Sequence, residues 1–133
     1  MIKRKYIHKD HNVSVLLHHL VFPSKYRIAV LTNKVDTVIK DTSLEIERRY
    51  EIIFIETATD NDQIHLLVQA VPTYSVTYLV TLIKSLTARQ AFALCPERTT
   101  LGGEFWSSGY FASTVEQHGN ESVIVKYVKN QGN

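Results

Sequence analysis

Alternating and branched apolar residues mark several segments of this chain as β-strands separated by polar turns. Asn12–Phe22, "NVSVLLHHLVF", is rich in branched and aromatic residues and is closed by Pro23, which predicts a strand. Glu51–Thr57, "EIIFIET", predicts a second strand, followed by the turn "ATDND". After the polar loop "PERTTLGGE", Phe105–Val115, "FWSSGYFASTV", predicts a further extended segment.

A third strand is predicted within Thr59–Gln69, "TDNDQIHLLVQ", where a turn leads into an alternating segment that Pro72 closes. Successive side chains of a strand point to opposite faces, so Gln63 and His65 share one face. The other face is apolar and is formed by Ile64, Leu66, Val68 and Ala70. A glutamine and a histidine side by side on such a strand raise the question of a functional role.

Helical periodicity separates the strands. Thr32 and Asn33 are predicted to cap a helix that runs to about Tyr50, and Ser75 is predicted to cap a second one that fades by Cys95–Pro96. The apolar stripes of these two helices are Val35, Val38, Ile39, Thr42 and Ile46 in the first, and Val76, Leu79, Ile83 and Leu86 in the second. A last short helix is predicted from near Asn120 or Glu121 to about Gln131.

This order of elements, β-α-β-β-α-β followed by a helix, predicts an α+β, ferredoxin-like fold within a single domain of residues 1–133. In that fold the helices cover one face of an antiparallel sheet and leave the other face open. Gln63 and His65 are expected on the open face, where a partner has access to them. The fold hosts many functions, so it does not decide among them.

Composition narrows the class of protein only slightly. The chain is 44% hydrophobic and 21% charged, with a net charge of +2, and its basic start, "MIKRKYIHKDH", permits a nucleic-acid partner. A solvated basic terminus explains the same residues equally well. The single cysteine, Cys95, excludes an intrachain disulfide and a cysteine zinc cluster. No signal-peptide core or long apolar run is present, so we expect a cytoplasmic protein without a membrane partner.

Candidate chemistry lies in the third strand and the last helix. Gln63 and His65 are suitable ligands for an open divalent-cation site, in which water and substrate oxygens complete the shell. Tyr127 and Gln131 are four residues apart and share a helix face, so a tyrosine nucleophile and a further oxygen ligand are available if that helix meets the open face of the sheet. A lone strand histidine and a helical tyrosine are, however, more often structural residues.

Four blocks of the chain, in order, resemble the single-tyrosine HUH transposases of small bacterial and archaeal insertion sequences, the TnpA-type enzymes. "LLHHLVFPSKYRIAVL" resembles their H-x-V-F-x-x-K-Y-R run, and "TDNDQIHLLVQAVP" resembles the segment with the histidine–hydrophobe–histidine motif. "LVTLIKSLTARQAF" resembles the helix that follows, and "FWSSGYFASTVEQHGNESVIVKYVKNQ" resembles the W-x-x-G-Y-F strand, the glycine joint and the nucleophile helix.

The resemblance implies a role for individual residues. Tyr127 matches the nucleophile, His65 the second histidine of the metal-binding pair, Gln131 the helix glutamine that completes the metal shell, and Gly119 the hinge before the nucleophile helix. His19 matches a family position to which we assign no role. The candidate DNA-binding residues are Lys25, Arg27, Lys84 and Arg89.

Gln63 departs from the family pattern, which has a histidine at this position. Two outcomes are open. Gln63 either still binds Mg²⁺ or Mn²⁺ through its amide oxygen, with reduced affinity because the amide is uncharged, or the site is impaired and the protein has become a binder.

The resemblance also implies an activity and partners. The family's substrate is single-stranded DNA with small hairpins near the ends of the element, which is cut and rejoined through a 5′-phosphotyrosine with a divalent cation. The expected assembly is a homodimer with composite active sites. The alternatives are a module that binds hairpin DNA or RNA without cutting it, and an unrelated ferredoxin-like binding domain.

Overall fold

The computed structural model describes residues 13–25, 32–60, 62–95 and 104–119 of the chain. The elements, in chain order, are β1 (Val13–Pro23), α1 (Asn33–Arg49), β2 (Ile52–Thr59), β3 (Gln63–Ala70), α2 (Val76–Leu94) and β4 (Phe111–Gly119). The predicted last helix lies outside the described residues.

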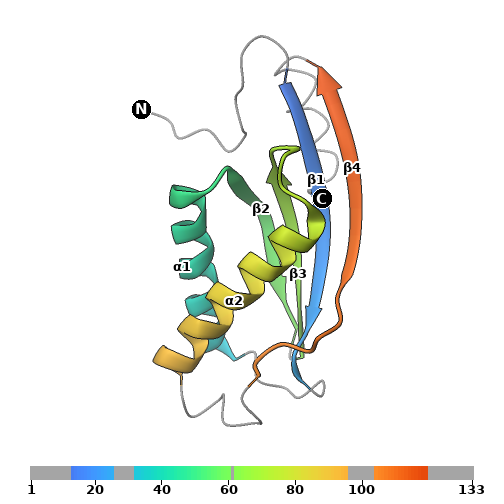
Figure 1. The fold of residues 1–133 in the computed structure, drawn as a ribbon. Coiled ribbons are helices and arrows are strands. Elements are labelled where there is room, and N and C mark those ends of the chain that lie inside the picture. The colour runs from blue at the N-terminus through green and yellow to red at the C-terminus, as the bar shows by residue number, and fades with distance from the viewer. Residues whose placement is uncertain (1–12, 26–31, 61, 96–103, 120–133) are drawn as a thin grey trace.

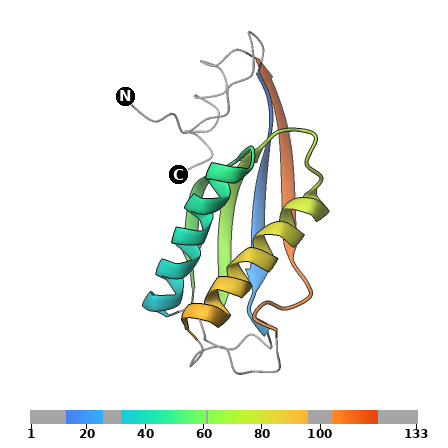
Figure 2. The same cartoon turned by 60° about the vertical axis from the view of Figure 1, so that its left-hand side comes forward.

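The four strands form one antiparallel sheet in the order β2-β3-β1-β4. Both helices lie on the same face of this sheet (Figures 1 and 2). The predicted α+β arrangement is therefore confirmed. No helix in the described part of the chain is long and apolar enough to cross a bilayer.

The core lies between the helices and the covered face of the sheet, and its members follow the predicted periodicities. Every residue of the predicted α1 stripe is buried, whereas Leu79 and Ile83 of the α2 stripe are buried and Val76 and Leu86 pack partly buried against them. From the sheet, the alternate β3 residues Ile64, Leu66, Val68 and Ala70 are all buried. Alternation along β3 thus sends its apolar side chains toward the helices and leaves Gln63 and His65 on the other face.

The fourth strand begins later than predicted, at Phe111 rather than Phe105. Residues 105–107 run instead against the end of β1. Lys25 N–H donates to Phe105 O (2.9 Å) and Ser107 N–H donates to Pro23 O (2.8 Å). Trp106 is buried, and its Nε1–H donates to Thr87 Oγ1 of α2 at 2.9 Å. The aromatic residues Phe105 and Trp106 are therefore buried in a loop that packs under α2, and they are not part of a strand of the sheet.

Candidate functional site

Gln63 and His65 lie at the start of β3, in the interior of the sheet. In the strand register Gln63 is opposite Pro23 of β1, and His65 is opposite Val21 of β1 and Ala58 of β2. Because β3 has a neighbour on both sides, its backbone is fixed by two ladders of hydrogen bonds. Both side chains are half-buried on the face that the helices leave uncovered. The predicted placement of this pair is confirmed.

The two side chains contact each other directly. Gln63 Nε2 lies 3.0 Å from His65 Nε2, a hydrogen-bond distance at which the amide N–H donates when that imidazole nitrogen carries no proton. A 180° rotation of the amide exchanges its nitrogen for its oxygen at the same place. The carbonyl oxygen of Gln63 and the lone pair of His65 Nε2 then converge on the same region in front of the sheet.

This spacing fits a divalent cation. Two ligands that each lie about 2.1 Å from one Mg²⁺ ion are roughly 3.0 Å apart when cis and roughly 4.2 Å apart when trans. The 3.0 Å between Gln63 and His65 equals the cis value. Within the described residues no group of three or more His, Cys, Asp or Glu side chains is arranged to hold a metal. The residues present thus fit an open site that depends on an amide and on ligands from elsewhere.

An aromatic surface borders the pair. His19, on the exposed side of β1, has its ring centroid 6.2 Å from that of His65 and 6.4 Å from that of Phe111, which it meets edge-on. Phe111 is 57% exposed. Exposed rings next to polar ligands provide a surface on which an unpaired base can stack. The sequence alone gives His19 no role and does not single out Phe111.

A carboxylate that the sequence prediction missed lies beside His65. Asp60, in the turn between β2 and β3, has its Oδ2 at 3.8 Å from His65 Nε2. The acidic turn "TDND" was the available signal, but turn conformation decides which of its carboxylates faces the strand. Here the backbone hydrogen bond from Asp60 N–H to Gln63 O (2.9 Å) folds the turn back onto the start of β3.

The two lysines predicted to bind DNA are engaged within the protein. Lys84 Nζ donates to the carbonyl oxygens of Ser107 (2.7 Å) and Gly109 (3.1 Å), and burial lowers the pKa of its ammonium, an effect that Glu104 opposes. Lys25 Nζ donates to Glu104 Oε1 at 2.6 Å, and this hydrogen bond is the main reason that the pKa of Glu104 is lowered. In this structure both ammonium groups therefore hold the segment that leads into β4.

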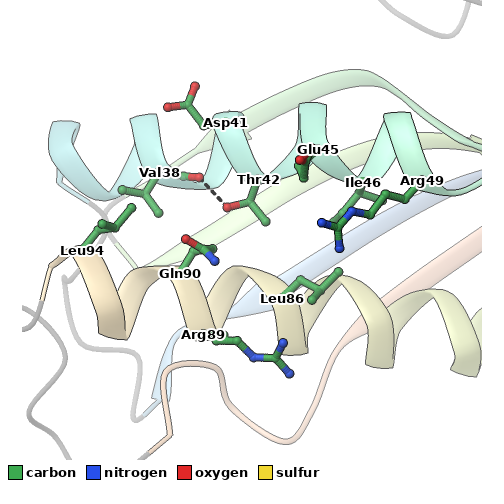
Figure 3. Close-up of a pocket in the computed structure, with 10 residues that line it drawn as sticks. All are labelled: Val38, Asp41, Thr42, Glu45, Ile46, Arg49, Leu86, Arg89, Gln90 and Leu94. Carbon is green, nitrogen blue, oxygen red and sulfur yellow. Dashed lines mark hydrogen bonds between the residues drawn. The ribbon is translucent and has the colours of Figure 1, made fainter.

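Arg89 lies on the other side of the molecule from Gln63 and His65. It borders a groove of about 350 Å³ between α1 and α2, together with Arg49 (Figure 3). The groove also carries acidic, polar and apolar side chains: Val38, Asp41, Thr42, Glu45, Ile46, Leu86, Gln90 and Leu94. The sheet separates this groove from the Gln63–His65 pair, so the structure does not bring Arg89 to the predicted metal ligands.

The remaining predicted residues are described only in part. Gly119 is the last residue of β4 and pairs with Val13 of β1. Tyr127, Gln131 and Arg27 lie outside the described residues. The relation of Tyr127 to Gln63 and His65 therefore remains a prediction from the sequence.

Known proteins are similar to this chain in sequence and in fold. The family described as "Transposase IS200 like" matches residues 12–131. The ISDra2 transposase TnpA of Deinococcus radiodurans is 30% identical over 118 residues, which cover 87% of this chain and 84% of that protein.

Two solved structures are similar. One is the crystal structure of a candidate transposase from Deinococcus radiodurans R1, with a TM-score of 0.68 and 26% identity over 98% of this chain and 97% of the other. The second is a REP-associated tyrosine transposase bound to a REP hairpin, which shares only the fold, with a TM-score of 0.52 and 12% identity over 96% of this chain and 68% of that one. The match to the family over nearly the whole chain, together with these similarities, shows that the chain belongs to the IS200-like transposases.

Proposed function

We propose that the protein cuts and rejoins single-stranded DNA, with Tyr127 as the nucleophile and Mg²⁺ or Mn²⁺ held by Gln63, His65 and Gln131. The observation that supports this most directly is the 3.0 Å contact between Gln63 and His65 on the open face of the sheet, in a chain of the IS200-like family. A pair of ligands at this spacing leaves coordination positions for substrate oxygens.

In the proposed reaction the phenolic oxygen of Tyr127 attacks the scissile phosphorus in line. A bond forms between that oxygen and phosphorus, the bond to the 3′-oxygen breaks, and the products are a 5′-phosphotyrosine and a free 3′-OH. The reverse reaction with a different 3′-OH rejoins strands without ATP, because the covalent link conserves the bond energy. When bound, the cation supplies polarisation of the phosphate and stabilises charge on its oxygens.

Recognition is proposed to use hairpins near the ends of the element, since a REP-associated tyrosine transposase of the same fold binds a REP hairpin. His19 and Phe111 provide exposed rings beside the ligands for an unpaired base. The proposed assembly is a homodimer in which Tyr127 of one subunit serves the Gln63–His65 pair of the other, with Gly119 as the hinge. Glycine suits a hinge because it adopts backbone angles that other residues resist.

A covalent-adduct assay tests the proposal. The protein is incubated with labelled single-stranded DNA from its own element ends and Mn²⁺, and is then run on a denaturing gel. We expect an adduct in the parent protein and none in Tyr127→Phe, because phenylalanine lacks the attacking oxygen. Gln63→His is the matched variant, and we expect it to form the adduct at least as fast, since imidazole is the stronger ligand.

A second function, hairpin binding without cutting, is favoured by Gln63 itself, because an uncharged amide is a modest ligand. An adduct that forms only in Gln63→His, with hairpin binding intact in the parent, would support this function instead. An adduct that survives Tyr127→Phe would contradict the assignment of the nucleophile.

A further inference from the structure

The ligand pair on β3 has no negative charge. Gln63 contributes an amide and His65 a neutral imidazole, and both are neutral donors. Mg²⁺ and Mn²⁺ are hard cations that bind carboxylates in preference to amides, and affinity rises with the number of charged ligands. A site made only of these two residues is therefore weak unless a carboxylate lies within reach.

Asp60 places a carboxylate close to the imidazole of His65. Its Oδ2 is 3.8 Å from His65 Nε2, whereas two cis ligands of one cation are roughly 3.0 Å apart, so a small rotation of the exposed Asp60 side chain would bring its oxygen to a cis position. The distance is also too long for a hydrogen bond, and the lone pair of His65 Nε2 already accepts from Gln63. Asp60 thus lies beside the imidazole without a hydrogen bond to it.

The backbone that carries this carboxylate is held in place, and the carboxylate itself is exposed. The hydrogen bond from Asp60 N–H to Gln63 O holds the backbone of the turn against the start of β3. The Asp60 side chain is 66% exposed, and within the described residues it has no other ion pair. Three donors, from Asp60, Gln63 and His65, therefore border one region in front of β3.

We propose that Asp60 is a direct ligand of the divalent cation and compensates for the neutral amide at Gln63. The inference rests on the proposed function, because it assigns a further residue to the same metal site. The predicted metal site has three ligands from residues 60–65: the carboxylate of Asp60, the amide oxygen of Gln63 and the imidazole of His65.

The test is Mn²⁺ binding to the protein alone, measured by titration with electron paramagnetic resonance. We expect Asp60→Asn to weaken Mn²⁺ binding about tenfold to 100-fold, because it removes the charged ligand and keeps the shape of the side chain. Glu56→Gln is the matched control. Glu56 lies on β2, on the same face of the sheet, and its side chain has no ion pair within the described residues. The substitution therefore removes one negative charge near the site without removing a proposed ligand. We expect Mn²⁺ affinity to change less than twofold.

A double-mutant cycle tests the compensation itself. In a Gln63→His background, the site has a second imidazole, so we expect Asp60→Asn to cost less Mn²⁺ affinity than in the parent. Equal losses in the two backgrounds would overturn compensation. Co²⁺ absorption separates a direct ligand from an indirect effect: the d–d bands should change in Asp60→Asn, and unchanged bands would overturn direct ligation.

Failure of this inference is distinguishable from failure of the proposed function. If Asp60→Asn binds Mn²⁺ like the parent and still forms the Tyr127 adduct, the inference is wrong and the function stands. If the parent forms no adduct with DNA, the function fails, whereas Mn²⁺ binding still decides the role of Asp60. Thermal unfolding of Asp60→Asn shows whether the variant is folded, and Asp60→Ser is the second variant if it is not.

Discussion

His18 shows how strongly one residue's surroundings depend on which way it points from a strand. It precedes His19, yet its side chain is fully buried on the helix-covered face, whereas His19 is exposed. His18 Nδ1 lies 2.9 Å from Thr114 Oγ1, and its Nε2 has no hydrogen-bond partner among the described residues. Burial therefore lowers the pKa of His18 below its usual value.

This burial predicts acid sensitivity. The unfolded chain protonates His18 as pH falls through about 6.5, whereas the folded chain resists protonation, so the unfolded state binds more protons and the free energy of unfolding decreases. The loss continues until pH passes the lowered pKa of the folded state. We expect His18→Gln to remove this component of the pH dependence. Urea unfolding between about pH 7.5 and pH 5 measures it, with His19→Gln as control.

Equal slopes in His18→Gln and the parent would contradict the assignment. Loss of the contact with Thr114 is expected to lower the stability of His18→Gln above pH 7 by about 1 kcal/mol. The comparison therefore rests on the change with pH and not on the absolute stability.

At the scale of elements, the two helices begin differently although both have a hydroxyl residue at the N-cap. Ser75 Oγ accepts a hydrogen bond from Tyr78 N–H at 3.0 Å, whereas Thr32 makes no side-chain capping bond and its Oγ1 is buried without a partner among the described residues. α1 instead places Asp36 in its first turn and Arg48 and Arg49 in its last, which complements the helix dipole. A residue type that suits an N-cap is thus not sufficient evidence that it caps.

We expect Ser75→Ala to lower the free energy of unfolding by about 1 kcal/mol, because it leaves the Tyr78 N–H without its acceptor. Thr32→Ala, the matched control, should cost clearly less, since it removes a hydroxyl that makes no capping bond. Thermal or urea unfolding of both variants checks the difference. A larger loss in Thr32→Ala than in Ser75→Ala would show that the capping assignment is wrong.

At the scale of the whole molecule, the sheet divides the chain into a stabilising side and a candidate reactive side. α1 and α2 pack on one face, and the donors Asp60, Gln63 and His65 border the other. β3 contributes to both, because its odd and even positions face opposite ways. The groove between α1 and α2, with Arg49 and Arg89 (Figure 3), belongs to the first side. The sheet lies between this groove and the proposed ligands.

This division predicts that substitutions on the two faces of β3 have different effects: those on the core face lower stability, and those on the open face weaken cation binding. Leu66→Ala, at a position that is 2% exposed in the core, should lower the free energy of unfolding by about 2–5 kcal/mol. Gln63→Ala removes only a half-buried hydrogen bond, so we expect a loss of about 1 kcal/mol or less, together with weaker Mn²⁺ binding. Urea unfolding and Mn²⁺ titration measure the two effects, and similar losses of stability in both variants would contradict the division.

The sequence by itself determined which residues form the strands and helices and which side of β3 faces the core. These features follow from local periodicity: alternation placed Gln63 and His65 together, and the spacing of Val35, Ile39 and Ile46 placed them on the inward face of α1. The family followed from motifs that occur in order along the chain. The roles of Tyr127 and Gln131 stay predictions, since both lie outside the described residues.

Only the tertiary structure decided which side chains from distant segments meet. Strand pairing brings His19 of β1 beside His65 of β3, and the conformation of the β2–β3 turn aims Asp60 at the same imidazole. Packing of Phe105 and Trp106 under α2 brings the carbonyls of Ser107 and Gly109 to the ammonium of Lys84, although the sequence marks Lys84 only as a cation. The periodicity of the sequence gives the orientation of a side chain relative to its own helix or strand. Its neighbours are set by strand register, turn conformation and burial, and these three features depend on the whole chain.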